Sequence, residues 1–279
     1  MQKVHVDNLC LEITRRCNLK CMHCLRGDSE NKDMSNDILN NIFSDISSIR
    51  RLDLMGGEPL LAPNVIENLI KIINERKIKI DVISFTTNGT VMSQRHVELL
   101  QQLKNIANLD VRLSHDKFHL IEITKKGLAD ISKRNLSTFK ELLGYSPEEK
   151  EFFIDEFGIR RVGRAKGLTQ EVLDVINKWR YPTEYCIVPL TWQDTDDIIE
   201  ISDWGKDVIK VFGHLSISVN GYLTRMDQEY SIEDFDPVFN LSVKNQRLLD
   251  VLKQYESICQ EDLGNDYARY RDLIEERHK

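Results

Sequence analysis

The sequence lacks several features that would place it in a special class of protein. It has no apolar run long enough to cross a bilayer, and its first residues, MQKVHVDN, lack the apolar core of a secretory leader. It has no solenoid-type repeat and no low-complexity segment. It also lacks an excess of basic residues, with 38 Lys and Arg against 45 Asp and Glu and a formal net charge of −7. We therefore expect a cytoplasmic protein with no membrane association, and the charge disfavours nucleic acid as a partner.

Cysteine is scarce, with six in 279 residues, so a disulfide framework is not expected in a reducing cytosol. A chain of this length with 41% hydrophobic residues can build one large core, or one large domain and a small one. The composition is therefore that of an ordinary soluble enzyme.

Three of the cysteines, Cys17, Cys21 and Cys24, lie close together in the segment LEITRRCNLKCMHCLRG. Three thiolates on one short loop can each ligate one iron of a [4Fe-4S] cluster and leave the fourth iron open to another ligand. Two other interpretations stay open. A zinc site needs four ligands, but the chain offers no second CxxC or HxxxH, and His23 adjoins Cys24 too closely to serve well. The cysteines can also be inert.

Short apolar strands alternate with amphipathic helices, the pattern of a parallel sheet covered by helices. We expect strands over about 9–14, 51–55, 80–86 and 109–114. Ser35 is a candidate cap for a helix whose apolar positions are spaced for one face, and Ser93 is a candidate cap for another. The positions expected on the first helix are Ile38, Ile42, Ile46 and Ile49.

Each expected strand is followed by a polar or glycine-rich loop. These loops are the cysteine loop, GGEP at 56–59, TTNG at 86–89 and SHD at 114–116. The cysteine loop followed by GGEP resembles the radical S-adenosylmethionine (SAM) superfamily. The resemblance implies an α/β fold, a partial (β/α)6-type TIM barrel that is complete or abbreviated, in which the open iron chelates the methionine part of SAM.

The resemblance also assigns roles to residues. It implies that the GGEP loop meets the ammonium group of SAM, that TTNG orients cofactor or substrate, and that the SxD segment faces ribose and methionine. RVGRAKG, at 161–167, resembles the GRA loop of the superfamily, where the arginine contacts a carboxylate of cofactor or substrate. The implied metal ligands are Cys17, Cys21 and Cys24, and the implied cofactor-binding residues are Gly56, Gly57, Glu58, Pro59, Thr87, Asn88, Ser114, Asp116 and Arg164.

Each of these motifs also has a purely structural interpretation. GGE alone is a turn, Asn-Gly is a common turn, and Arg164 in a basic loop can be a solvated surface residue. His115 and His119 lie near the SxD segment, but histidines in such loops are more often surface or packing residues. No catalytic side chain is predicted, because the cofactor carries the chemistry.

The region after about residue 185 has a different pattern. Strand-like alternation over 215–219, Asn220-Gly221 and a second strand over 222–224 predict a β-hairpin, followed by a helix over about 245–259. This order resembles a SPASM or twitch appendage without its cluster cysteines, since Met226 stands where a cysteine is expected and Cys186 and Cys259 have no close partners. We therefore predict a partial barrel over 1–185, a small region over 186–279 and no auxiliary cluster.

Between these regions, a capping box at 146–149 predicts a helix to about 157, and a strand is predicted over 158–162.

The resemblance implies an enzyme that reductively cleaves SAM at one [4Fe-4S] cluster to a 5′-deoxyadenosyl radical, which abstracts hydrogen from a substrate. The appendage favours a peptide or protein substrate, such as a precursor peptide. A one-electron donor such as flavodoxin or ferredoxin is implied as a partner. The alternatives are a glycyl-radical activase or small-molecule enzyme, and a non-catalytic metal-binding regulatory protein.

Overall fold

The computed structural model describes residues 2–24, 26–147, 164, 169, 200–203, 206–224 and 240–263. The predicted helix at 146–157, the strand at 158–162 and the boundary between 185 and 186 lie almost entirely outside these residues. Among the described helices, none is long and apolar enough to cross a membrane.

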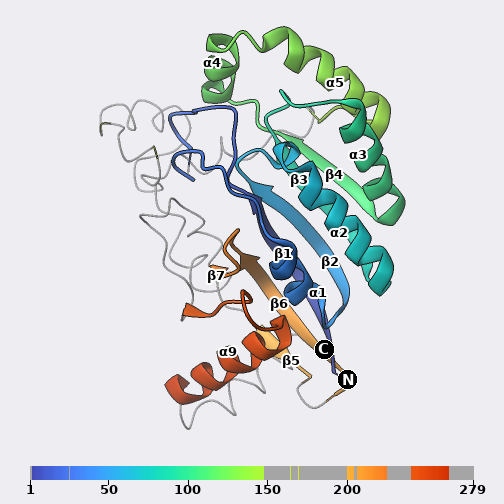
Figure 1. The fold of residues 1–279 in the computed structure, drawn as a ribbon, viewed down its shortest axis with the longest axis vertical. Helices are drawn as coiled ribbons and strands as arrows, with labels where there is room; N and C mark the ends of the chain where they lie inside the picture. The colour runs from blue at the N-terminus through green and yellow to red at the C-terminus, as the bar shows by residue number, and fades with distance from the viewer. Residues whose placement is uncertain are drawn as a thin grey trace, which may run out of the picture.

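A seven-stranded sheet with the order β4-β3-β2-β1-β6-β5 forms the centre of the molecule, and β7 pairs with β6 (Figure 1). Five strands are parallel, and the short strands β5 and β7 run antiparallel to β6. The α/β class and the parallel sheet are confirmed. The strands are β1 Lys3–Thr14, β2 Ile46–Gly56, β3 Lys79–Thr87, β4 Asn108–Leu113, β5 Glu200–Ser202, β6 Val208–Ile217 and β7 Leu223–Thr224.

Figure 1 shows α2 and α3 on one face of the sheet, with α4 at one end of the molecule and α9 at the other. The helices begin where the sequence places their caps, since Ser35 accepts from the N–H of Ile38 at the start of α1 and Ser93 precedes α3. The helices are α1 Asn36–Phe43, η1 Pro59–Leu61, α2 Pro63–Arg76, α3 Gln94–Ile106, α4 Lys117–Lys125, α5 Ala129–Leu143 and α9 Leu248–Leu263.

One sequence prediction about α1 and β2 was wrong. Ile46 and Ile49 were expected on the first helix, but this helix ends at Phe43 and both isoleucines belong to β2. The reason is tertiary: Ile46 and Ile49 pair with Val4 and Val6 of β1 and are buried in the sheet. Helical spacing of β-branched residues fits a buried strand equally well when a neighbouring strand covers them.

The predicted hairpin is confirmed, with β6 and β7 paired antiparallel and Gly221 in the left-handed region at φ 82°. Its first strand, however, is longer than predicted and lies beside β1, with which it pairs in parallel. The sheet is therefore shared between the two predicted regions, and the hairpin extends the sheet that carries the cysteine loop.

The two faces of the sheet differ in character because side chains alternate along each strand. The row Ile217, Leu11, Leu54, Phe85 and Val111 is buried in the hydrophobic core. The adjacent row, on the opposite face, is polar on every strand. Its members are Ser216, Cys10, Asp53, Ser84 and Asp110. A polar second face is what a barrel-like sheet with a solvated interior requires, whereas a sheet with helices on both faces is apolar throughout.

Candidate active site

The four predicted loops meet at the carboxyl edge of the parallel strands. The N–H of Gly57 donates to the carbonyl of Thr14 at 2.9 Å, and the N–H of Glu58 donates to the carbonyl of Arg16 at 2.7 Å. The N–H of Ser114 donates to the carbonyl of Thr87 at 2.8 Å. These bonds join the second loop to the first and the fourth to the third, so the motifs form one continuous surface.

Glycine is required at both positions of the GGEP loop. A Cβ on Gly56 would lie 2.2 Å from the carbonyl oxygen of Thr14, and φ of Gly56 is +143°. A Cβ on Gly57 would lie 2.3 Å from the carbonyl oxygen of Arg16 and 3.0 Å from Cβ of Cys17. The paired glycines therefore allow the end of β2 to pack directly against the start of the cysteine loop.

The three cysteines are free thiols in an apolar setting. Cys21 is buried and packs with Leu19 and Ile123, and Cys17 and Cys24 lie beside this group. Burial raises the pKa of Cys17 to about 11 and that of Cys21 to about 12, and the neighbouring thiols add to the rise. Such thiols become thiolates only when a cation binds them, so the donor set suits a metal centre.

The number of thiols separates the two metal interpretations. The cysteine loop supplies three thiols, Cys17, Cys21 and Cys24. A structural zinc site takes four protein ligands in a tetrahedron. A cubane cluster binds each thiolate to a separate iron and can leave its fourth iron open to another ligand. The residues present therefore fit a [4Fe-4S] cluster.

Glu58 is fully buried beneath the loops. Its Oε1 accepts from the hydroxyl of Thr87 at 2.8 Å and the N–H of Leu60 at 3.1 Å, and its Oε2 accepts from the N–H of Asn88 at 2.7 Å. Burial raises the pKa of Glu58 to about 7, although these hydrogen bonds act in the opposite direction. The carboxylate thus clamps the second and third loops together, and its contact with the ammonium group of SAM stays a prediction.

Asn88 connects the third loop to the cysteine loop. Its side-chain NH₂ donates to Oδ1 of Asn18 at 2.9 Å, and its Oδ1 accepts from the N–H and hydroxyl of Thr90. Asn18, which also donates to the hydroxyl of Thr90 at 2.8 Å, was missed in the sequence. An amide next to Cys17 is a weak signal, because such residues are common in loops.

Asp116 caps α4 and binds two histidines. Its Oδ1 accepts from the N–H groups of Phe118 and His119, and its Oδ2 lies 2.6 Å from Nδ1 of His119 and 3.2 Å from Nε2 of His23. Burial acts to raise the pKa of Asp116, but the hydrogen bonds and charges of the two histidines outweigh it and hold this pKa well below its usual range. The predicted cofactor residue thus also anchors the cysteine loop to α4.

His23 occupies the position before the last cysteine, where the superfamily usually has an aromatic residue. Its ring stacks on Phe118 with centroids 4.7 Å apart, and the ring of His119 meets it edge-on at 5.0 Å. His23 therefore performs the packing role of an aromatic side chain and adds a polar contact to Asp116.

Arg164 lies against the cysteine loop. Its Nε donates to the carbonyl of Cys21 at 2.9 Å, its Nη1 donates to the carbonyl of Gly27, and its backbone N–H donates to the carbonyl of Cys24 at 3.1 Å. The guanidinium also approaches Asp28 at 3.3 Å. The side chain thus holds the loop backbone, and its contact with a carboxylate of cofactor or substrate stays a prediction.

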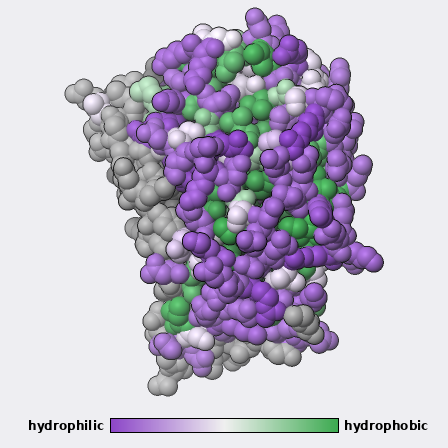
Figure 2. Space-filling view, in the orientation of Figure 1, coloured by the Kyte–Doolittle hydropathy of each residue, from purple (hydrophilic) through white to green (hydrophobic). Residues whose placement is uncertain are grey.

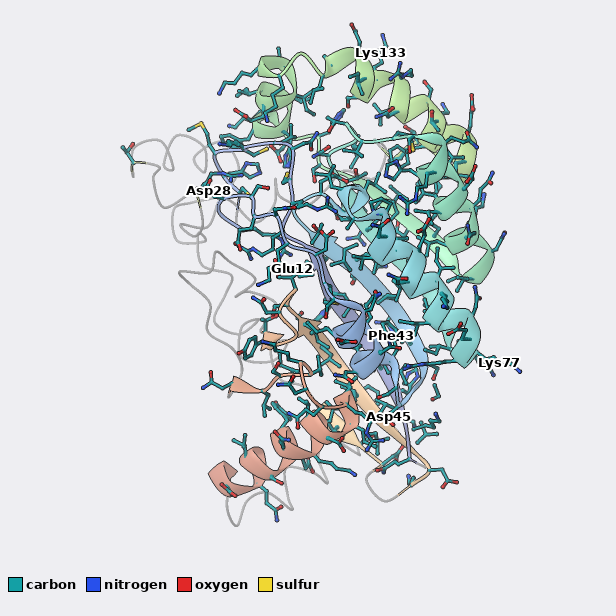
Figure 3. All side chains as sticks on the ribbon, viewed as in Figure 1. Glu12, Asp28, Phe43, Asp45, Lys77 and Lys133 are labelled. Carbon is teal, nitrogen blue, oxygen red and sulfur yellow. The ribbon has the colours of Figure 1, made fainter. Side chains whose placement is uncertain are left out.

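Glu12 is a buried acid near the end of β1 that the sequence analysis did not select. Its Oε1 accepts from Arg26 at 2.7 Å and Arg15 at 3.1 Å, and its Oε2 accepts from the N–H of Val219 at 3.0 Å. Figure 3 labels Glu12 on the ribbon between the cysteine-loop segment that carries Asp28 and the orange strands of the hairpin. The available signal was a single acid inside the apolar strand LCLEIT.

The comparison with known families identifies the class of this domain. Residues 11–146 match the Radical SAM superfamily, and this stretch contains the three cysteines and the GGEP, TTNG and SxD loops. Residues 11–146 therefore belong to the radical SAM superfamily, and this match supports an enzyme.

Curated relatives match about half of the chain. The GTP 3′,8-cyclase of Clostridium perfringens is 32% identical over 133 residues, which cover 45% of this chain and 40% of that protein. The GTP 3′,8-cyclase of Desulforamulus reducens is 30% identical over 147 residues, which cover 50% of this chain and 44% of that protein. The match therefore spans less than half the length of these relatives.

Two solved structures align over a larger share of the chain. The structure of anSMEcpe with bound AdoMet and the Cp18Cys peptide has a TM-score of 0.45 and 15% identity and covers 98% of this chain and 83% of that chain. Streptococcus suis SuiB bound to the precursor peptide SuiA has a TM-score of 0.40 and 16% identity. This match covers 90% of this chain and 64% of that chain.

Proposed function

We propose that this protein is a radical SAM enzyme with one [4Fe-4S] cluster held by Cys17, Cys21 and Cys24. When bound, the cluster and SAM supply reductive cleavage of the sulfur–C5′ bond to methionine and a 5′-deoxyadenosyl radical, which takes a hydrogen atom from a substrate carbon. The observation that carries this proposal is the triplet of thiols in an apolar setting, packed against a glycine pair that tolerates no side chain.

The chain's own residues bind and position. Arg164 lowers the pKa of Cys17 and Cys21 by its charge, against the larger effect of burial, and its guanidinium holds the loop carbonyls. Gly56 and Gly57 let the GGEP loop pack directly against the start of the cysteine loop. Ser114 and Asp116 follow the end of β4 and are proposed to contact SAM. No side-chain base is needed for the radical step, since the cofactor abstracts the hydrogen atom.

The test is the formation of 5′-deoxyadenosine from SAM under anaerobic conditions with dithionite as reductant. The reconstituted protein should form it slowly without substrate, and Cys21→Ala should abolish both iron binding and product. Cys10→Ala is the matched control, because Cys10 is also a buried cysteine but lies in the middle of β1. Zinc in place of iron, or a stable cluster without SAM cleavage, would favour a metal-binding regulatory protein instead.

The proposal of a single cluster has its own test. Cys186→Ala and Cys259→Ala should leave the iron content unchanged, whereas a loss of iron in either variant would reveal an auxiliary site. Neither side chain lies among the described residues.

For the substrate, we propose a peptide or protein. The support is the order of hairpin β6–β7 and helix α9, which resembles the appendage of peptide-modifying members of the superfamily. The curated relatives favour a second candidate, a nucleotide such as GTP, although they match only about half of the chain. The proposal includes a flavodoxin or ferredoxin as reductant and a cytoplasmic location.

Two observations separate the substrate candidates. A short precursor peptide encoded beside this gene, modified in mass when incubated with the enzyme and SAM, would support the peptide. Consumption of GTP with accelerated formation of 5′-deoxyadenosine would support the nucleotide, and a large glycyl-radical enzyme encoded nearby would favour an activase.

A further inference from the structure

Exposed hydrophobic side chains occur on the cysteine loop and on α4, the helix that packs against this loop. Among the described residues, the large exposed ones are Met22 at 46%, Leu120 at 44%, Ile121 at 46% and Val208 at 38%. Met22 belongs to the cysteine loop, and Leu120 and Ile121 belong to α4. Figure 2 shows hydrophobic surface set among hydrophilic residues at the end of the molecule that carries α4 and α5. Single exposed residues need no explanation, but a group at one place does.

Helix α4 lies directly against the cysteine loop. Phe118 stacks on His23, Ile123 packs with Leu19 and Cys21, and Nζ of Lys126 donates to the carbonyl of Asn18 at 2.5 Å. With this face of α4 buried, helical spacing turns Leu120 and Ile121 toward solvent. Met22 stands between Cys21 and Cys24 in the chain, so the exposed side chain of the cysteine loop lies between two of the proposed cluster ligands in the sequence.

The two segments that carry these side chains are basic, and the exposed acids Asp28 and Asp130 lie just beyond them. The exposed charged residues of segments 17–24 and 117–128 are all lysines, and the one acid in these segments, Glu122, is buried and paired with Lys125 at 2.9 Å. Four lysines against one glutamate give +3 here, in a chain of net charge −7. The lysines are Lys20, Lys117, Lys125 and Lys126.

We propose that this surface docks an acidic one-electron carrier protein, with Met22, Leu120 and Ile121 at its centre and the four lysines at its rim. The inference rests on the proposed function, because only a redox centre at the cysteine loop needs an electron there. One electron leaves the reduced carrier, which is oxidised by one electron, and enters the cluster, with no proton transferred. A small apolar centre with a rim of one charge suits the weak, steered encounters typical of electron-transfer partners.

The test compares reduction by a protein with reduction by a small molecule. The probe is flavodoxin, kept reduced by NADPH and flavodoxin reductase, and the reference reductant is dithionite. The variants are Leu120→Gln with Ile121→Gln, and Lys20→Glu with Lys117→Glu. The substitutions to Gln preserve the helix propensity of α4, and Glu in place of Lys117, at the first position of α4, interacts favourably with the helix dipole.

Each double variant should weaken flavodoxin binding, measured by titration, on the order of tenfold. The flavodoxin-driven rate of 5′-deoxyadenosine formation should fall by a similar factor. The iron content and the dithionite-driven rate should not change. Rising salt should slow only the flavodoxin-driven reaction of the wild type. Val208→Gln and Lys253→Glu are the matched controls, since both residues are exposed and lie away from α4, on β6 and on α9 at the far end of the molecule (Figure 1).

The possible failures are distinguishable. If wild type forms no 5′-deoxyadenosine even with dithionite, the proposed function fails. If dithionite works but the variants bind flavodoxin as wild type does, the docking surface is wrong. If the variants lose the substrate-coupled reaction equally with both reductants, the surface receives substrate, which also overturns the proposal.

Discussion

At the level of single residues, Gly57 is the glycine whose steric limit is set directly by the start of the cysteine loop. The carbonyl of Arg16 occupies the space that a Cβ would need, at 2.3 Å. Gly57→Ala should therefore force the GGEP loop away from Cys17 and destabilise the protein by about 2–3 kcal/mol, as overpacking of a fitted contact does. Iron retention after reconstitution should fall with it.

Gly127→Ala is the control for this prediction. Gly127 has φ +65°, but nothing lies within 4 Å of an added Cβ. Its substitution should cost about 1 kcal/mol in urea unfolding from backbone strain alone and leave iron retention intact. Equal loss of iron in the two variants would contradict the steric explanation.

His96 makes a pH-dependent contribution to stability. Its Nε2 lies 2.8 Å from the carbonyl of Leu60 just after GGEP, and its Nδ1 lies 2.8 Å from the hydroxyl of Ser93. The carbonyl only accepts, so Nε2 carries the hydrogen of this bond. Burial lowers the pKa of His96 from its ordinary value of 6.5, although the bond to Leu60 acts in the opposite direction.

Between this lowered pKa and 6.5 the folded protein binds fewer protons than the unfolded chain, so stability rises with pH there and is lost on acidification. His96→Gln removes this component. The difference in unfolding free energy between wild type and variant, from urea titrations, should shrink as the pH falls from about 8 to about 5. A difference independent of pH would refute the assignment.

At the level of secondary-structure elements, α4 is held by its N-cap. Asp116→Ala removes the acceptor for two N–H groups of α4 and for two histidines. We expect a loss of about 1–2 kcal/mol in urea unfolding from the cap. We also expect weaker iron retention, because His23 loses its contact with α4.

Ser35→Ala is the matched control, since Ser35 caps α1 and has no contact with the cysteine loop among the described residues. It should cost a similar free energy without changing iron retention. If Asp116→Ala retains iron as well as Ser35→Ala does, Asp116 is only a helix cap.

The sequence predicted the parts of the site that follow strand ends. The chain alternates strands and helices, and successive strands are followed by Cys17, Gly57, Asn88 and Asp116. This pattern was enough to predict that the four loops meet, because parallel strands bring their carboxyl ends to one edge of the sheet. It could not predict the ring stacking of His23, since this contact depends on how α4 packs. Nor could it predict that Ile46 belongs to a strand, because its burial comes from pairing with Val4 across the sheet.

At the scale of the whole molecule, the superfamily domain is not self-contained. β6 lies outside the matched stretch 11–146 yet pairs with β1, and the N–H of Val219 binds the buried carboxylate of Glu12. A fragment of residues 1–199 should therefore expose one edge of β1 and lose this bond. We expect it to aggregate or to unfold without cooperativity in circular dichroism. A fragment that unfolds cooperatively and retains iron like the full chain would show that the hairpin is an accessory.

The central claim is that three cysteines leave one iron of a cubane open to SAM. The most direct measurement is electron-nuclear double resonance on the reduced, reconstituted protein with SAM labelled with ¹⁷O in its carboxylate. We predict about four irons per chain and a ¹⁷O coupling that shows the carboxylate bound to iron. A cluster whose spectrum is unchanged by SAM, with no ¹⁷O coupling, would contradict it.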